Sequence, residues 1–276
     1  MRVVQRVQHR FQLMVLSASG KNTEALHVSG VRVLRGDLDQ PRSLRRVAGL
    51  ADRVLHLAPP AADGWRDART RALVHALRRR GPPLALVYVS TSGVYGDCAG
   101  AVVRETRPAR ADTPRARRRA DAESAVRFFG RSAHLRASIL RVPGIYAQDR
   151  EGGTPRKRLL AGTPLLRAQD DVFTNHVHAD DLARACVAAL WLGRAQRVYN
   201  VNDDTRLKMG DYFDLAADLY GLPRPPRIAR TAAQSELPLG LLSFMGESRQ
   251  MDNTRLKREL KLRLRYPTVA DGLRPA

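Results

Sequence analysis

Short apolar runs alternate with segments of helical periodicity along the first half of the chain. Five runs are rich in the aliphatic and β-branched residues that favour buried strands; they are residues 11–16, 31–34, 53–57, 84–89 and 137–142. The segments between them that predict helices are 22–29, 41–48, 66–80 and 114–129. Pro41 and Pro114 fit first-turn positions, where the missing N–H costs nothing. This alternation predicts parallel βαβ units, and therefore an α/β fold with a doubly wound parallel sheet.

The regular alternation of predicted strands and helices ends after residue 145. The stretch 152–155 (GGTP) predicts a loop, and helices are expected at 180–191 and 209–220 among proline-rich connections. We therefore predict a sheet domain over residues 1–145 and a smaller α+β domain over residues 146–276. Part of the smaller domain is expected to pack back on the first.

Ligands of doubly wound sheets bind beyond the carboxyl ends of the strands. Because parallel strands end at one edge of a sheet, several of these ends can contact one ligand. The candidate ligand-binding segments are the ones that follow the predicted strands: 17–21, 36–39, 58–59, 90–96 and 143–146.

The composition is that of an ordinary globular protein. Of the 276 residues, 43% are hydrophobic and 27% are charged. No apolar run approaches the roughly 18 residues that a membrane-spanning helix needs, and the first 19 residues lack the continuous apolar core of a signal peptide. The two cysteines, Cys98 and Cys186, provide neither a disulfide framework nor a metal cluster. A reducing cytoplasm is the expected location.

The net charge of +21 attracts phosphate groups, in nucleic acid, in membranes or in nucleotides. Of the 48 basic residues, 43 are arginines, and they are spread along the chain with local runs only at 78–80 and 115–119. We interpret most of them as solvated arginines that reflect composition. An arginine-driven nucleic-acid binder remains a third functional alternative, although no nucleic-acid-binding motif is present.

Six motifs occur in an order that is typical of one enzyme family. GDLDQ, VLHLAPP, VYVSTSGVYGD, LRVPGIYA, NHVHADDLA and YNVNDD resemble the extended short-chain dehydrogenase/reductases, the NAD(P)-dependent epimerase/dehydratase group. The resemblance extends from about residue 11 to the C-terminus. It implies a Rossmann-like NAD(P)-binding domain over residues 1–145 and a substrate-binding region over 146–276. It also implies oxidoreduction or epimerisation of a small polar or nucleotide-linked substrate.

The segment 90–96 (STSGVYG) is the best candidate for the catalytic centre. Hydroxyls at the end of a central strand can bond a substrate oxygen and stabilise developing charge. The resemblance makes Thr91 the catalytic hydroxyl, because the family's Ser or Thr stands four residues before Tyr95. The alternative is that these hydroxyls only cap the strand end. The residues that the resemblance places at the substrate are Ser92, Tyr95, Arg141 and Tyr146.

The expected dinucleotide contacts lie at other strand ends. Asp37 either accepts a bond from an adenine amino group, as in the family's GDLxD motif, or caps the helix near Pro41. Leu57, Ala58 and Pro59 form either a small-residue strand end that a dinucleotide approaches closely or a strand end without a ligand. Pro143 is a further expected contact. The end of the first predicted strand carries Ser17, Ser19 and Lys21 rather than a carboxylate, which favours NADP over NAD.

The family's Tyr-x-x-x-Lys pair is replaced by Arg115 and Arg119. An arginine cannot act as the general acid or base, because it does not release its proton near neutral pH. Arg119 is still expected to hold a ribose or a phosphate of the cofactor. The pattern resembles atypical members of the group, and the general base is unassigned. The alternative function is therefore a non-catalytic dinucleotide sensor or interaction protein.

No G-x-G-x-x-G motif precedes residue 90, although a dinucleotide fold needs one after its first strand. Residues 2–16 resemble the end of the first helix and the second strand of such a fold. We therefore expect the first strand and the glycine-rich loop, about 10–15 residues, to be missing from the start of this sequence.

His176 and His178 would share one face of a strand. Because no third ligand is evident, no metal site is expected. Asp180 is expected to be the N-cap of the helix that follows. The expected partners are a dinucleotide and a small substrate, with a second copy of the chain as a further expectation.

Overall fold

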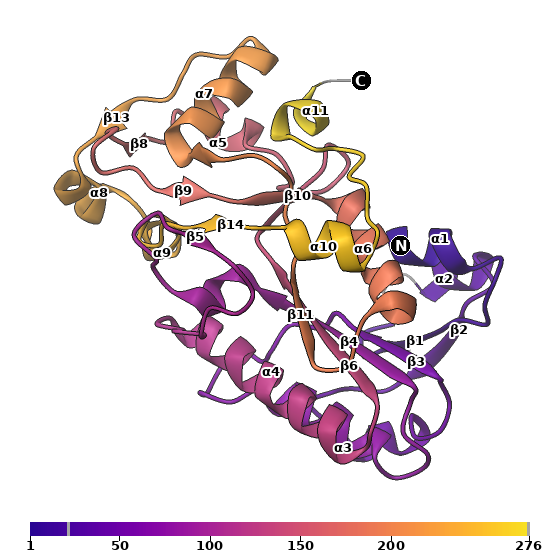
Figure 1. Cartoon of the computed structure of the whole chain (residues 1–276). Coiled ribbons are helices and arrows are strands. Elements are labelled where there is room, and N and C mark those ends of the chain that lie inside the picture. The colour runs from indigo at the N-terminus through magenta and orange to yellow at the C-terminus, as the bar shows by residue number, and fades with distance from the viewer. Residues whose placement is uncertain (21–22, 275–276) are drawn as a thin grey trace.

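A four-stranded parallel sheet forms the centre of the computed structural model, which describes residues 1–20 and 23–274. Its strand order is β11-β6-β4-β3 (Figure 1). The strands are β3 (Arg53–His56), β4 (Ala85–Thr91), β6 (Arg136–Val142) and β11 (Arg197–Asn200). β4 and β6 are the longest strands of this sheet and are largely buried, in keeping with the apolar runs at 84–89 and 137–142.

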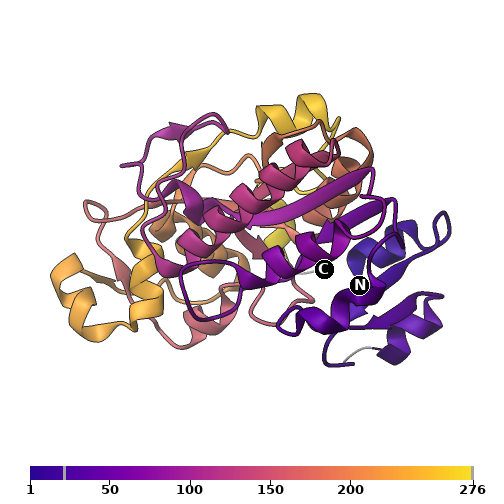
Figure 2. The ribbon, with the colours of Figure 1, turned by 90° about the horizontal axis from the view of Figure 1, so that it is seen from below.

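Helices cover both faces of this sheet, so the predicted doubly wound α/β fold is confirmed. On one face lie α3 (Ala68–Leu77) and α4 (Pro114–Ser132) (Figure 2). Their apolar side chains share a core with Leu86, Tyr88 and Ile139. On the other face lie α6 (Ala179–Leu192) and α10 (Thr254–Glu259), which share a core with Val87 and Leu140.

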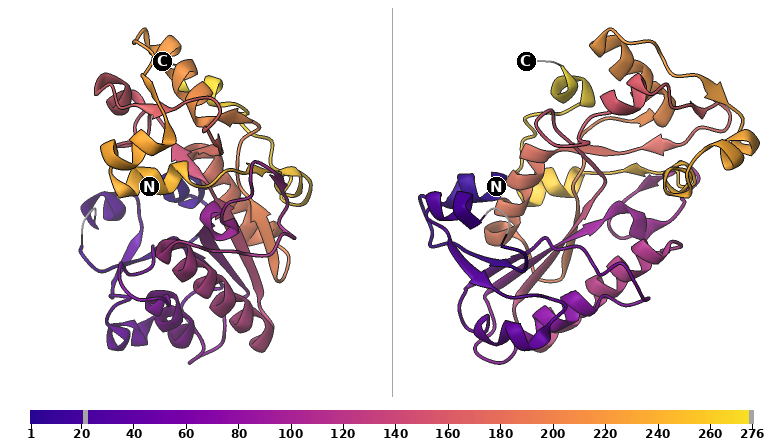
Figure 3. Two further views of the ribbon diagram at one scale, coloured as in Figure 1. Left: turned by 90° about the vertical axis from the view of Figure 1, so that its left-hand side faces the viewer. Right: turned by 180° about the vertical axis from the view of Figure 1, so that it is seen from behind.

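A separate two-stranded parallel sheet lies on the side of the N-terminus (Figure 3). It consists of β1 (Met14–Ser17) and β2 (Arg32–Arg35). Within the described ranges, β1 pairs only with β2, and β3 pairs only with β4. The short helices α1 (Arg2–Val7) and α2 (Thr23–Val28) pack on this small sheet through a core of Val4, Leu26 and Val31.

Several predicted element ends differ from the structure. The strand expected at 11–16 begins at Met14, because Phe11 instead packs on the ring of Trp191 at 4.7 Å between centroids. The segment 41–48 forms a 3-10 helix, η1 (Pro41–Arg46), rather than an α-helix. The helix predicted at 66–80 is the shorter α3, since Asp67 caps its start through the Thr70 N–H. Lys21 and Asn22, at the start of the helix predicted at 22–29, lie outside the described residues.

The prediction that Asp180 caps α6 is wrong. The N-cap is His178, whose Nδ1 accepts the Asp180 N–H at 3.2 Å. Asp180 lies inside the first turn, where its carboxylate accepts a bond from the Arg2 guanidinium at 2.7 Å. The histidine thus takes the role expected of the aspartate, and the aspartate ties α1 to α6.

The rest of the chain forms a second region, in the upper part of Figure 1, around its own apolar core. Its strands pair in twos: β7 (Gly144–Tyr146) with β10 (His176–His178), β8 (Leu165–Leu166) with β13 (Arg227–Ile228), and β9 (Phe173–Thr174) with β12 (Leu207–Lys208). Its helices are α5 (Arg156–Leu160), α7 (Met209–Tyr220), α8 (Arg230–Glu236), α9 (Leu239–Met245) and α11 (Val269–Leu273). β5 (Val102–Val103) and β14 (Gln250–Met251) connect the two regions. The division at residues 145 and 146 stays a prediction.

Among the described helices, none combines the length and the apolar character needed to cross a membrane.

Candidate functional site

The carboxyl ends of the central strands bring together several of the predicted site residues. Thr91 ends β4 opposite Val142 of β6, so Pro143 follows on the neighbouring strand. On the other side of β4, Leu57 follows β3 and is exposed, as is Pro59, whereas Ala58 is half-buried. Thr91 and Pro143 are also half-buried. This edge therefore presents one hydroxyl among small and apolar residues.

Thr91 has the position and the chemistry of a hydrogen-bond donor to a ligand. Its Oγ1 accepts the Gly93 N–H at 3.3 Å and so caps the 3-10 helix η2 (Ser92–Tyr95). The capping alternative is thus observed. It does not use the hydroxyl hydrogen, so Thr91 can still donate to an oxygen of a ligand. Ser92, the next residue, is buried.

Arg119 lies against the same strand end. One of its guanidinium nitrogens donates to the Val89 carbonyl at 2.8 Å and to the Tyr88 hydroxyl at 3.0 Å. Burial raises the pKa of Tyr88 to about 12, so this phenol stays protonated near neutral pH. Arg115, one turn earlier on α4, is exposed, and its guanidinium lies 4.9 Å from the ring centroid of Phe244 on α9. Of the two arginines, only Arg119 is bonded to β4.

A buried series of hydrogen bonds between side chains lies at the end of β3. His56 Nε2 lies 2.8 Å from Thr70 Oγ1, and the Thr70 hydroxyl donates to Asp67 at 2.6 Å. Burial lowers the pKa of His56 to about 4, so the imidazole is neutral at physiological pH. These hydrogen bonds could not be predicted from the sequence, because helical and strand periodicity do not report which polar side chains meet.

Tyr95 and Arg141 are held by protein partners. The Tyr95 hydroxyl donates to Asn200 Oδ1 at 2.6 Å, and its side chain is fully buried. The Arg141 guanidinium lies 4.5 Å from the Tyr95 ring centroid and donates twice to Glu123, at 3.1 and 2.7 Å. This geometry favours a role in holding η2 against β6 and α4. Contact with a substrate stays a prediction for both residues.

Tyr146 lies in the core of the second region. Its hydroxyl donates to the Thr268 carbonyl at 3.2 Å, and its ring meets those of His176 and His178 edge-on. Burial lowers the pKa of His176 to about 4. Across residues 1–20 and 23–274, no group of three or more His, Cys, Asp or Glu side chains could hold a metal ion.

The remaining predicted cofactor contacts lie near the small sheet. Asp37 Oδ1 accepts the Asp39 N–H at 2.9 Å, whereas the N-cap of η1 is Gln40, so Asp37 does not cap that helix. Ser17 ends β1 and is half-buried, and Ser19 is exposed in the loop that follows. Lys21 is outside the described part of the chain. Contacts of Asp37, Ser17 and Ser19 with a dinucleotide stay predictions.

Residues 3–202 match the sequence profile of the NAD dependent epimerase/dehydratase family. No curated protein matches the chain.

Solved structures with the same fold cover nearly the whole chain. A functionally unknown conserved protein from Silicibacter pomeroyi is 28% identical, with a TM-score of 0.80 over 99% of this chain and 92% of that one. RMD from Pseudomonas aeruginosa, complexed with NADPH, is 21% identical, with a TM-score of 0.71 over 96% and 97% of the two chains. UDP-glucuronic acid 4-epimerase from Bacillus cereus, in complex with NAD, is 17% identical, with a TM-score of 0.77 over 98% and 91%.

Proposed function

The chain belongs to the NAD-dependent epimerase/dehydratase family, and on that premise we propose that it binds NAD(P) at the carboxyl edge of the sheet. We propose oxidoreduction or epimerisation of a small polar or nucleotide-linked substrate as its reaction. The observation that carries the proposal is that the carboxyl-terminal part of β4 carries the Thr91 hydroxyl and also holds the Arg119 guanidinium, which bonds the Val89 carbonyl. The NADPH and NAD bound to the similar structures described above support the cofactor class.

The side chains at this edge fit the nicotinamide half of a dinucleotide. Ala58, Pro59 and Pro143 are small enough at their strand ends for a flat ring to approach the backbone. Arg119 would hold a ribose or a phosphate, with its position fixed by Val89 and Tyr88. Bound there, the dinucleotide would supply hydride transfer.

The adenine half would lie towards the small sheet. Ser17 and Ser19 would meet its ribose, and Asp37 its adenine amino group. Because neither serine position carries a carboxylate that would repel a 2′-phosphate, we expect NADPH to bind more tightly than NADH.

The chain's own contribution to the chemistry is electrostatic. The Thr91 hydroxyl would donate to the reacting oxygen of the substrate and stabilise the charge that develops there. Arg115 replaces the usual tyrosine and cannot exchange a proton near neutral pH. Proton transfer would therefore fall to the substrate itself or to water at this edge.

A second candidate function is a dinucleotide sensor without catalysis. The placement of Arg115 favours this second function. Arg115 stands where the family has its catalytic tyrosine, and its guanidinium stacks on Phe244 of the second region. The two candidates share the dinucleotide site and differ in whether bound NADPH is ever oxidised.

Melting temperature measured against NADPH and NADH tests the shared site. A ligand that binds only the folded state raises the melting temperature, so we expect a rise with both and a larger one with NADPH. Arg119→Met is expected to weaken binding about tenfold through loss of a charge-assisted bond, while Arg119→Lys retains part of it. Arg79→Met, at an exposed site beyond α3, is the matched control. No rise with either nucleotide would contradict the proposal.

Thr91→Ala separates catalysis from binding. We expect turnover to fall about a hundredfold, because one donor to the developing charge is lost, with little change in the dissociation constant of NADPH. The measurement is NADPH oxidation with a panel of nucleotide sugars and small ketones, beside binding by fluorescence. Thr91→Ser keeps the hydroxyl and should retain most of the activity. Equal losses of turnover and NADPH affinity would argue against the catalytic role.

A further inference from the structure

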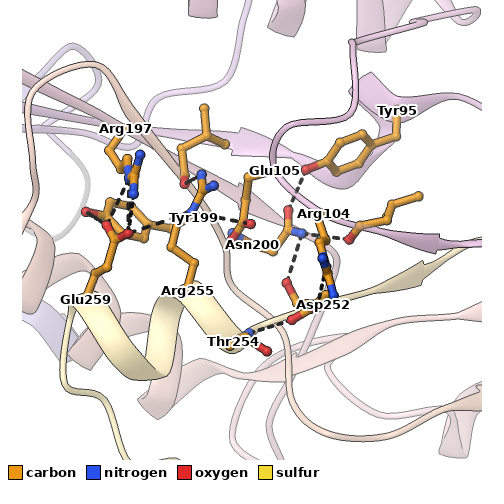
Figure 4. Close-up of polar contacts among 12 residues, drawn as sticks. Tyr95, Arg104, Glu105, Arg197, Tyr199, Asn200, Asp252, Thr254, Arg255 and Glu259 are labelled. Carbon is orange, nitrogen blue, oxygen red and sulfur yellow. Dashed lines mark hydrogen bonds and ion pairs between the residues drawn. The ribbon is translucent and has the colours of Figure 1, made fainter.

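An arginine-lined groove runs along β11, the outer edge of the four-stranded sheet. Its volume is about 740 Å³, and its walls come from the loop 104–106, the turn before β11 and the helix α10 (Figure 4). Five of its ten lining residues are arginines. β6 separates β11 from β4, so the groove is distinct from the edge that carries Thr91.

Side chains already occupy the outward backbone groups of this edge strand. Glu105 accepts the Asn200 N–H at 3.1 Å, and Arg255 donates to the Val198 carbonyl at 3.0 Å. An extended peptide that added to β11 as a further strand would have to displace both. A ligand in the groove would therefore contact side chains and would not form backbone hydrogen bonds with β11.

The charges in the groove do not balance. Each of its three carboxylates lies against an arginine; the pairs are Arg104–Asp252 at 3.2 Å, Arg197–Glu259 at 2.5 Å and Arg255–Glu105 at 3.6 Å. The other two arginines, Arg194 and Arg258, are exposed, and neither lies within 4.0 Å of a described carboxylate, although Arg194 is near enough to Glu259 to help lower the pKa of that carboxyl. The groove thus carries two guanidinium charges in excess.

We propose that this groove binds a small phosphate ester in its dianionic form, held by Arg194 and Arg258. A phosphate monoester carries about −1.5 to −2 charges at neutral pH, which matches the two unpaired guanidiniums. The planar fork of an arginine matches phosphate oxygens in two-bond geometry. Thr106, an exposed residue of the same walls, can supply a neutral hydroxyl donor, whereas the Thr254 hydroxyl is bonded to Asp252. The volume lies within the range of about 300–1,000 Å³ that is typical of small-ligand sites.

Calorimetric titration of the full chain with glucose 1-phosphate and with inorganic phosphate at pH 8 tests this site. Sodium chloride at equal ionic strength is the blank. Arg194→Gln and Arg258→Gln are each expected to weaken binding of both probes about tenfold, the effect of one lost charge-assisted bond. Arg258→Lys should retain most of the affinity, and Arg79→Gln is the control for general charge. All three positions are exposed, so the four variants should fold.

Three results would overturn the proposal. The first is a heat of titration no larger than that of the chloride blank. The second is equal affinity of the Gln variants and the wild type for both phosphate probes. The third is binding of duplex DNA that is tighter than binding of the phosphate ester and that the Gln variants weaken. The third would assign the groove to nucleic acid, and its signature would be a steep dependence on salt. NADPH affinity should be unchanged in these variants, so failure here is distinguishable from failure of the dinucleotide proposal.

Discussion

Glu123→Gln is expected to lower the free energy of unfolding by about 3–5 kcal/mol, the cost of leaving a buried charge without its partner. Glu123 and Arg141 are both less than a tenth exposed, and two hydrogen bonds join them. Glutamine keeps the shape but removes the charge that holds the Arg141 guanidinium in the core, over the ring of Tyr95. Urea unfolding followed by circular dichroism measures the loss.

Two further variants separate the buried charge from simpler explanations. Asp218→Asn breaks the exposed pair between Asp218 and Arg224 and should leave the stability almost unchanged, because solvent screens this pair. The double variant Glu123→Leu with Arg141→Met should recover much of the loss, since two apolar side chains need no partner. A loss below about 1 kcal/mol for Glu123→Gln would show that water reaches the pair.

The carboxyl group of Asp203 is expected to make the protein less stable as the pH rises. Burial raises the pKa of Asp203 to about 7, and the neighbouring Asp204 adds to the shift, although the Thr205 N–H opposes it. The folded state therefore favours the protonated acid. Its contribution to stability is complete below the unfolded pKa near 4 and is lost as the pH rises through 7, by about 4 kcal/mol in all.

Asp203→Asn tests this dependence, because asparagine keeps an oxygen for the Thr205 N–H and does not ionise. Relative to the wild type, the variant should gain about 3 kcal/mol of stability between pH 5 and pH 8. The measurement is urea unfolding of both proteins at each pH. Asp63→Asn, at an exposed position, should show no such gain. A difference that stays constant between the two pH values would mean that Asp203 is ionised throughout the range.

The central strands were predictable because a continuous local run of apolar residues indicates a strand that is buried on both faces. The runs 84–89 and 137–142 match β4 and β6 to within two residues, since both faces of these strands are covered and every position of the runs except Arg141 is apolar or small. Phe11 shows the limit of this signal. Its apolar side chain continues the run at 11–16, yet a tertiary contact with Trp191 takes it out of the strand.

The candidate site was predictable only in its position along the chain. Thr91 follows from the end of a buried strand and from a motif, but the bonds that fix Arg119 depend on how α4 packs on β4. The partners of Tyr95 could not be read either, because Asn200 lies 105 residues away. The groove along β11 was hidden for a related reason. Its arginines are indistinguishable in sequence from the many that are simply solvated.

The break between the two sheets has a consequence for cooperativity. No backbone ladder joins β1 to β3 within the described ranges, so the small sheet depends on its own modest core and on the contacts of α1 and Phe11 with α6. Regions with few shared contacts open at lower free energy than the rest of a protein. The N-terminal segment is therefore a separate unit of local unfolding, whose amides exchange with solvent before those of β4 and β6. A ligand that touched both sheets would join the two units, and part of its binding energy would appear as protection of β1 and β2.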